Sequence, residues 1–208
     1  MDLTTCDEHG VPWDFSKADR RKAAMDYIKR ARPIVVIGSP MCRMFSQIMR
    51  IDVKRQGRER YQREFRAAVD HVLFMLEVYD LQAKSGRYFV HEHPQQASSW
   101  NLPQVQQFIL QNQVYLTTNH LCMFGLTSTD RWGRSGPSKK PTTWMTNSPE
   151  IAKELGGKCD GSHVHVQLDG GDRTVKSQVY PHRFCDAILK GLGAPDQIGF
   201  RGQQCIVV

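Results

Sequence analysis

Residues 33–42 of this chain are PIVVIGSPMC, and this stretch decides the fold class. The four residues Ile34–Ile37 are all β-branched and show no polar alternation, which is typical of a strand buried on both faces, as in a parallel sheet. Pro33 separates this strand from the segment before it, and Gly38-Ser39-Pro40 ends it. The pattern therefore predicts a central strand followed by a tight turn that leads to Cys42.

Helix-like and strand-like segments alternate on both sides of this strand. Apolar residues at helical spacing predict helices over 17–31, 58–84, 103–112 and 181–192. Further strands are predicted over 87–91, 114–118, 142–146 and 163–168, the last in a hairpin closed near Gly170-Gly171. This order predicts an α/β protein with an open sheet and right-handed crossovers, in which ligands bind beyond the carboxyl ends of the strands.

Length and composition exclude several classes of protein. The 208 residues, 40% of them hydrophobic, are enough for one domain with a real core, so the chain is not wholly disordered. The apolar runs are too short to cross a bilayer, and the first residues lack a secretion signal, so no membrane partner is expected. Six scattered cysteines indicate reduced thiols in an intracellular compartment, nuclear or cytoplasmic, rather than a disulfide framework.

The chain is basic, and its positive charge is concentrated in two patches. Lysine and arginine outnumber acidic residues 28 to 21. Eight basic and three acidic residues lie between Arg43 and Arg66, and 131–140 contains four cations and no anion. Such patches favour a polyanionic partner, most simply nucleic acid, although a solvated helix face and a soluble loop would have the same composition.

Cys42 and Glu92 are the first candidates for chemistry. Cys42 follows the buried strand through a tight turn beside Arg43, where a thiol has a lowered pKa and is a better nucleophile. Glu92 ends the next strand, where a carboxylate can donate a proton or anchor a hydrogen bond. The alternatives are a small buried cysteine and an ordinary loop acid, but the two residues together would form a coherent site.

Several segments resemble the DNA cytosine-5 methyltransferases. Residues 38–46, GSPMCRMFS, are similar to the family's Gly-Ser-Pro-Pro-Cys-Gln-x-Phe-Ser loop, and Glu92-His93-Pro94 is similar to its Glu-Asn-Val segment. Lys140-Pro141-Thr142 with Thr146-Asn147 resembles a stretch of phage-type members that precedes the target-recognition region. Residues 2–5 resemble the short acidic segment near the cofactor, and 179–181 resemble the start of the closing helix. The segments follow the family's order from about residue 2 to about residue 192.

The resemblance implies a Rossmann-like three-layer sandwich that transfers a methyl group from S-adenosylmethionine to C5 of cytosine in double-stranded DNA. The base would be flipped out, Cys42 would attack C6, and Glu92 would contact N3. By the same resemblance, the residues that contact the cofactor would be Asp2, Leu3, Ser39 and Pro40. The residues that contact DNA would be Arg43, Arg131, Arg134, Lys139 and Lys140.

The sequence also departs from the family. It starts after the Phe-x-Gly-x-Gly turn that cradles the cofactor, and Met41, Arg43 and His93 replace the usual proline, glutamine and asparagine. We therefore expect a domain that is incomplete at its N-terminus, with a catalytic-type core over 1–155, a small hairpin region resembling a target-recognition region over 156–180, and a closing helix with a flexible tail over 181–208. An open sheet edge in place of the first strand would pair with a second copy or with a complementing fragment.

Other functions remain open at this point. The chain is a methyltransferase if it is active, and otherwise a catalytically silent, basic module that binds nucleic acid, or a fragment derived from a mobile element. A third hypothesis is a different thiol enzyme that uses Cys42 with His91 or His93. Trp132, in the basic glycine-containing loop, is a candidate for stacking on a base, whereas Trp144 lies in a predicted strand and is expected in the core.

A weaker signal concerns metal binding. Cys159, His163 and His165 offer three ligands that suit zinc, with Cys122 or Cys185 as a possible fourth. The two histidines alternate with Val164 and Val166, however, as on the polar face of an ordinary strand. The spacing differs from standard zinc fingers, so the sequence favours a strand with no metal over a zinc site.

Overall fold

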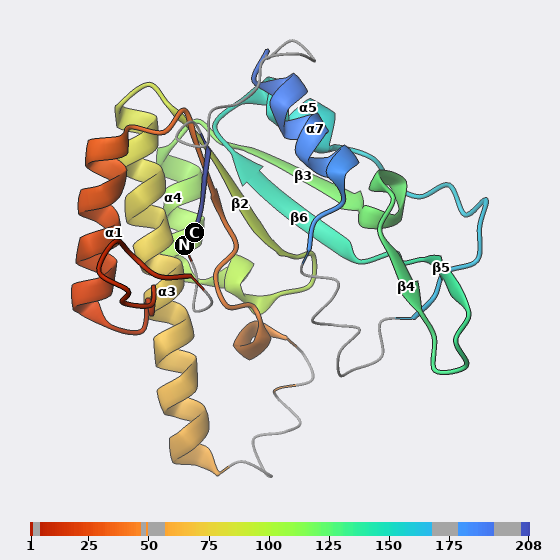
Figure 1. Cartoon of the computed structure of the whole chain (residues 1–208), viewed down its shortest axis with the longest axis horizontal. Helices are drawn as coiled ribbons and strands as arrows, with labels where there is room; N and C mark the ends of the chain where they lie inside the picture. The colour runs from red at the N-terminus through yellow and green to blue at the C-terminus, as the bar shows by residue number, and fades with distance from the viewer. Residues whose placement is uncertain (2–4, 47–48, 50–56, 168–178, 194–204) are drawn as a thin grey trace. The chain divides into compact units, whose positions relative to one another are not determined.

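The protein is a mixed α/β structure (Figure 1). The structure, a computed structural model, describes the whole chain apart from residues 2–4, 47–48, 50–56, 168–178 and 194–204. Its contacts group into two compact units, one formed by Met1–Val114 with Gly199–Val208 and the other by Tyr115–Ile198. Within the described parts of the chain, no helix is both long and apolar enough to span a membrane.

The first unit is built on three parallel strands. The strand β1 (Val35–Gly38) pairs on one side with β2 (Tyr88–Pro94), where Gly38 lies opposite His91. All four residues of β1 are buried, so the predicted doubly buried strand is confirmed, one residue later than expected because Ile34 is 39% exposed.

On its other side, β1 pairs in parallel with β7 (Cys205–Val207). The amide of Ser39 donates to the carbonyl of Val208, and that of Val208 donates to the carbonyl of Ile37, which extends this pairing. The edge of β1 at which the sequence predicted a partner strand is therefore occupied by β7, and residues 205–207 of the predicted tail form a strand. The homodimer and the complementing fragment stay predictions.

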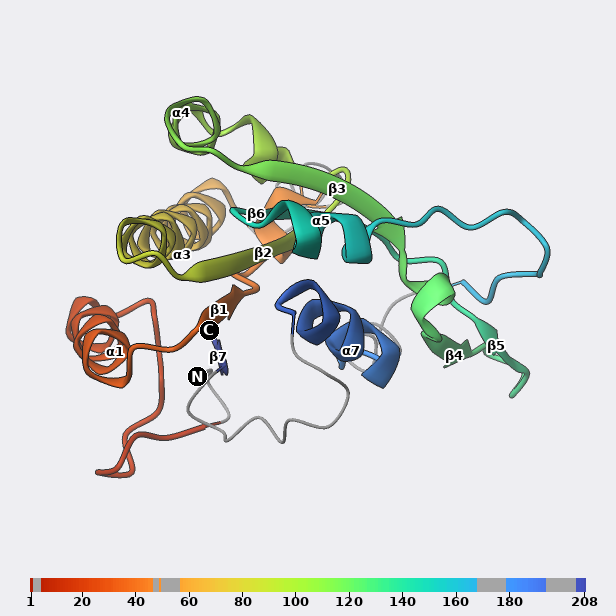
Figure 2. The ribbon, with the colours of Figure 1, turned by 90° about the horizontal axis from the view of Figure 1, so that it is seen from above.

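Three helices of the first unit lie in a row beside these strands, α1 (Ala18–Ala31), α3 (Arg58–Lys84) and α4 (Pro103–Gln111) (Figure 2). The bounds of α3 agree with the prediction, because its apolar stripe is long and Ser85-Gly86 ends it, with Gly86 at a φ of 66°. Two short 3₁₀ turns complete the unit, η1 (Arg43–Phe45) after β1 and η2 (Ser98–Asn101) after β2.

Gly38 allows α3 to approach β1 closely. A Cβ atom at this position would lie 2.0 Å from the hydroxyl of Tyr79 and 2.5 Å from the terminal methyl of Met75, both on α3. No ordinary contact is that short, so a side chain here would push α3 away from the strand. Gly38, which ends β1, therefore also determines how closely α3 packs against the strand that leads to the Cys42 turn.

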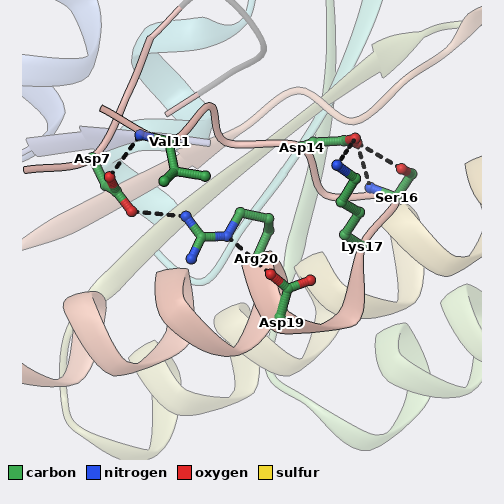
Figure 3. Close-up of polar contacts among 7 residues, drawn as sticks. All are labelled: Asp7, Val11, Asp14, Ser16, Lys17, Asp19 and Arg20. Atoms are coloured by element: carbon green, nitrogen blue, oxygen red, sulfur yellow. Dashed lines mark hydrogen bonds and ion pairs between the residues drawn. The ribbon is translucent and has the colours of Figure 1, made fainter. Parts of the chain in front are cut away.

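The segment before α1 is fixed by polar contacts (Figure 3). The carboxylate of Asp7 accepts the amide of Val11 at 2.9 Å and the guanidinium of Arg20, on α1, at 2.7 Å. These hydrogen bonds hold the pKa of Asp7 below its usual value. Asp14 accepts both the amide and the hydroxyl of Ser16 in the turn that leads into the helix.

The second unit contains two antiparallel pairs of strands. The strands β3 (Tyr115–His120) and β6 (Pro141–Thr146) form one pair, and β4 (Thr127–Thr129) and β5 (Ser135–Pro137) form a hairpin. The helices α5 (Pro149–Leu155) and α7 (His182–Gly191) pack against each other, and the turn η3 (Leu121–Phe124) follows β3. Trp144 is fully buried 4.4 Å from the ring of Phe184, as its strand position predicted.

One predicted strand of this unit is wrong. Residues 163–167 form no strand, and Val164 is 89% exposed instead of facing a core. Only Val166 bonds to a strand, donating its amide to the carbonyl of Pro137 at 2.8 Å. Leu168 and the turn predicted near Gly170-Gly171 lie outside the described residues. The alternation of valine and histidine therefore has a different cause.

Candidate functional site

The structure brings the Cys42 turn and Glu92 to the same end of neighbouring parallel strands. Because Gly38 pairs with His91, the next residues, Ser39 and Glu92, come level with each other. The hydroxyl of Ser39 donates to Oε2 of Glu92 at 2.6 Å, and Glu92 is only 3% exposed. Cys42 is half-buried, is not in a disulfide, and begins the turn η1 by accepting the amide of Phe45.

His93 holds the backbone that precedes Cys42. Its Nε2 lies 3.0 Å from the carbonyl oxygen of Pro40, and since a carbonyl can only accept, Nε2 carries the proton. Nδ1 is therefore the acceptor for the hydroxyl of Ser99. Burial lowers the pKa of His93 and keeps the ring neutral. Both nitrogens are thus engaged away from Cys42, so His93 is not the base that the thiol-enzyme hypothesis required.

Two more neutral histidines lie around this turn. Nδ1 of His91 is 3.0 Å from the hydroxyl of Tyr79, and burial lowers the pKa of His91 well below its usual value. The pKa of His71 falls to about 4, again mainly through burial, and its Nδ1 accepts the amide of Met41 at 3.4 Å. We call His71, His91 and His93 the histidine network. It supplies hydrogen bonds to the turn but no positive charge at neutral pH.

Of the four residues expected at the cofactor, the structure describes two, Ser39 and Pro40. Asp2 and Leu3 lie outside the described residues. Ser39 uses its hydroxyl on Glu92 and its amide on Val208, and the carbonyl of Pro40 accepts from His93. A hollow of about 750 Å³ lies between the N-terminal segment, α1 and β7, but neither Cys42 nor Glu92 lines it. Binding of S-adenosylmethionine therefore stays a prediction.

The basic residues expected at nucleic acid lie in both units. Arg43, at the start of η1, is exposed. In the second unit, Arg131 and Arg134 lie in the tip of the β4–β5 hairpin, where their guanidinium carbons are 4.1 and 4.9 Å from the ring centroid of Trp132. Trp132 itself is 64% exposed.

Asp130 builds this hairpin tip. Its carboxylate accepts the amides of Trp132 and Arg134 at 2.8 and 2.9 Å and the guanidinium Nε of Arg134 at 2.7 Å. Lys139 is exposed just after β5, and the Lys140 ammonium lies 5.6 Å from the ring centroid of Tyr180. Four of the five predicted DNA contacts, Arg131, Arg134, Lys139 and Lys140, thus belong to one hairpin and the short segment that follows it.

The second unit also gathers four potential metal ligands. The donor atoms of Cys122, Cys159, His163 and His165 all lie within 4.8 Å of one another. Burial and the neighbouring Cys159 raise the pKa of Cys122 to about 11 in the metal-free protein. Of the two cysteines that the sequence offered as a fourth ligand, the structure selects Cys122, while Cys185 is exposed on α7 and outside the group. The spacing of residues in the sequence did not indicate which of these two cysteines would join the group.

Comparison of the chain with models of protein families, with curated proteins and with solved structures finds no match. Its function therefore has to be argued from the geometry of its own residues.

Proposed function

We propose that this chain is a DNA-binding domain with a Rossmann-like core of the cytosine-5 methyltransferase type, and that it does not transfer methyl groups on its own. The observation that supports binding is the hairpin tip, where Trp132 is exposed between the guanidinium groups of Arg131 and Arg134. The second half of the proposal is supported by Ser39 and Pro40, whose hydroxyl, amide and carbonyl groups bond within the protein.

The side chains of the hairpin tip suit a nucleic acid, which offers both phosphate groups and bases. A guanidinium group can bind a phosphate through two parallel hydrogen bonds, and an exposed indole ring can stack on a base that leaves the duplex. Asp130 fixes the backbone of the tip through two amides and also accepts Nε of the Arg134 guanidinium, so the tip is ordered before binding. Lys139 adds a further exposed cation close in sequence.

Fluorescence anisotropy with a labelled duplex tests this proposal. We expect the double variant Arg131→Gln/Arg134→Gln to bind about 10- to 100-fold more weakly, and the salt dependence of log Kd to lose about two units of slope. The matched control is Lys22→Gln/Lys29→Gln, which removes the same charge from exposed positions of α1. Equal affinity of both double variants, or no binding by the wild type at low salt, would reject the hairpin as the DNA contact.

A second candidate is supported by the Ser39–Glu92 contact. In this alternative, Cys42 adds to C6 of a flipped cytosine while Glu92 donates a hydrogen bond to N3. Addition forms the S–C6 bond and brings a solvent proton to C5. Loss of the original C5 proton and cleavage of the S–C6 bond then regenerate cytosine. This cycle exchanges the C5 hydrogen without any cofactor.

The exchange can be followed by mass spectrometry of cytosine-containing DNA in heavy water. If the second candidate is correct, the wild type incorporates deuterium at C5 and Cys42→Ser does not, while both bind DNA equally well. If neither protein exchanges the hydrogen, the chain is a silent binding domain. Cys185→Ser is the control, because Cys185 is exposed and distant in sequence from the Cys42 turn.

A further inference from the structure

We propose that Cys122, Cys159, His163 and His165 bind one Zn²⁺ ion in a tetrahedral, structural site. The four residues come from two segments of the second unit, with Cys122 in η3 and the other three in the irregular stretch 157–167. This proposal is independent of the proposed function, since it concerns how these segments are held and not what they contact.

The distances between the donor atoms match the edges of a zinc tetrahedron. The two histidine Nε2 atoms are 3.1 Å apart, and Cys159 Sγ lies 3.5 Å from Nε2 of His163 and 3.4 Å from that of His165. With Zn–N and Zn–S bonds of about 2.0 and 2.3 Å, a regular tetrahedron has N–N edges of about 3.3 Å and S–N edges of about 3.5 Å. The three side chains are therefore spaced as ligands around a common centre.

The surroundings of the four ligands support the same assignment. The amide of Gly161 donates to Sγ of Cys159 at 3.4 Å, as expected beside a sulfur that becomes a thiolate. Nδ1 of His120 accepts the amide of Cys159 at 2.9 Å and so fixes the backbone of that ligand. Cys122 is only 8% exposed. Hydrogen bonds to the amide and the sulfur of Cys159 therefore hold this ligand before any ion arrives.

The donor set selects the metal and its role. Two sulfur and two imidazole ligands in a tetrahedron favour Zn²⁺ over Mg²⁺ or Ca²⁺, which take oxygen ligands in larger numbers. Four protein ligands leave no open position for water or substrate, so the ion would be structural rather than catalytic. The alternation His-Val-His that suggested a strand is then explained, because both imidazoles turn to the metal while Val164 between them remains exposed.

Zinc at this position would anchor the base of the β4–β5 hairpin. Directly after His165, the amide of Val166 donates to the carbonyl of Pro137 at the end of β5, and the hydroxyl of Ser138 donates to the carbonyl of Val166. Cys122 lies in the turn that precedes β4, and Ser138 donates its amide to Leu126 across the hairpin base. One ion would therefore tie both ends of the hairpin to the stretch 157–167.

Metal analysis and cobalt substitution of the full chain test the proposal. We expect one zinc per chain after purification, and a Co²⁺-substituted protein with intense tetrahedral ligand-field bands and a thiolate-to-cobalt charge-transfer band. Cys159→Ser and His163→Asn should reduce the zinc content at least about 10-fold under the same conditions. The matched controls Cys185→Ser and His182→Asn, at exposed positions of α7, should keep one zinc per chain.

Experiments on the wild type test the proposal even if the ligand variants fail to fold. Removal of zinc with a chelator, followed by titration with Co²⁺, should restore the tetrahedral spectrum at a ratio of one ion per chain. An octahedral, pale spectrum without a charge-transfer band would overturn the proposal. A Cys122–Cys159 disulfide in the freshly purified protein, seen as a mass lower by two hydrogens than that of the reduced protein, would overturn it as well.

Discussion

Each of the two units contains a group of histidines. The two groups differ in the hydrogen-bond partners of their ring nitrogens. In the first unit, the histidine network bonds to a tyrosine, a serine and backbone groups, so each ring has protein partners of another kind. In the second unit, His163 and His165 face each other and Cys159 across distances of 3.1 to 3.5 Å. In the first group, hydrogen bonds to other residues engage at least one nitrogen of each ring, although Nε2 of His71 is buried with no hydrogen-bond partner among the described residues, whereas the second group leaves a centre that suits a cation.

This difference shows how a buried histidine and a metal ligand can be distinguished. Burial alone does not separate them, since His93 is fully buried and the proposed zinc ligands His163 and His165 are only half-buried. Their partners do distinguish them. The ring nitrogens of a structural histidine form hydrogen bonds with other residues, whereas the ring nitrogens of ligand histidines converge on one point. Each prediction below tests one side of this comparison.

The largest effect should come from removal of the metal. At a free zinc concentration about 1000-fold above its Kd, we expect the free energy of unfolding to exceed that of the chelated protein by about 4 kcal/mol. Urea unfolding with zinc and with EDTA measures the difference. Cys185→Ser should keep this dependence and Cys159→Ser should lose it. Superimposable unfolding curves of the wild type with zinc and with EDTA would show that the second group of histidines, like the first, needs no metal for stability.

His93→Ala should be the most damaging substitution in the histidine network. It removes the partners of the Pro40 carbonyl and the Ser99 hydroxyl and leaves a cavity, for a loss of about 3 kcal/mol. Chemical denaturation measures this loss, and the zinc content should stay unchanged. His93→Gln, which keeps a donor and an acceptor, should be less destabilising. A change below about 0.5 kcal/mol for His93→Ala would mean that the network does not hold the Cys42 turn.

The sequence predicted the parts of the fold that depend on local pattern. The apolar stripe of α3, its glycine end and the β-branched run of β1 are properties of neighbouring residues, and their positions were correct to within one residue. The position of β7 could not be predicted, because Cys205–Val207 is too short for a clear pattern and is fixed by pairing with β1.

The same distinction applies to the candidate sites. Glu92 and the Cys42 turn could be placed at one sheet edge, since the ends of neighbouring parallel strands meet there. The role of His93 as a support for Pro40 follows only from tertiary contacts. Cys122 is far from Cys159 in the sequence, so nothing in the spacing favoured it over Cys185. The strand prediction failed over residues 163–167, and the proposed zinc site explains the alternation there, because every second residue would be a ligand.

The stability of the first unit should fall with acid even when no metal is present. The pKa of His71 is about 4 in the folded protein, against an ordinary value of 6.5 that the unfolded chain keeps, so between these values the unfolded chain binds more protons. The contribution of His71 is complete above pH 6.5 and is lost as the pH falls towards 4, by about 2 kcal/mol at pH 5. Urea unfolding at pH 7.5 and 5.0, both with EDTA, measures it.

The matching variant is His71→Gln, which removes the titrating group and keeps an acceptor for the amide of Met41. Its unfolding free energy should change less between the two pH values than that of the wild type. The remaining slope comes from the other histidines whose pKa values are lowered mainly by burial, which include His91 and His93. Parallel pH profiles for the two proteins would show that His71 is not held neutral by the fold.

The smallest effect should come from Tyr79→Phe. The substitution removes only the hydroxyl that pairs with Nδ1 of His91 at 3.0 Å and keeps the ring stacked on Phe89, with centroids 4.5 Å apart. We expect a loss of about 1 kcal/mol, since one buried nitrogen then lacks its partner. The hydroxyl also lies where a Cβ on Gly38 would be, so Gly38→Ala should be better tolerated in combination with Tyr79→Phe than alone. A double-mutant cycle measured by urea unfolding tests this coupling, and strictly additive losses would mean that the Tyr79 hydroxyl does not control the approach of α3 to β1.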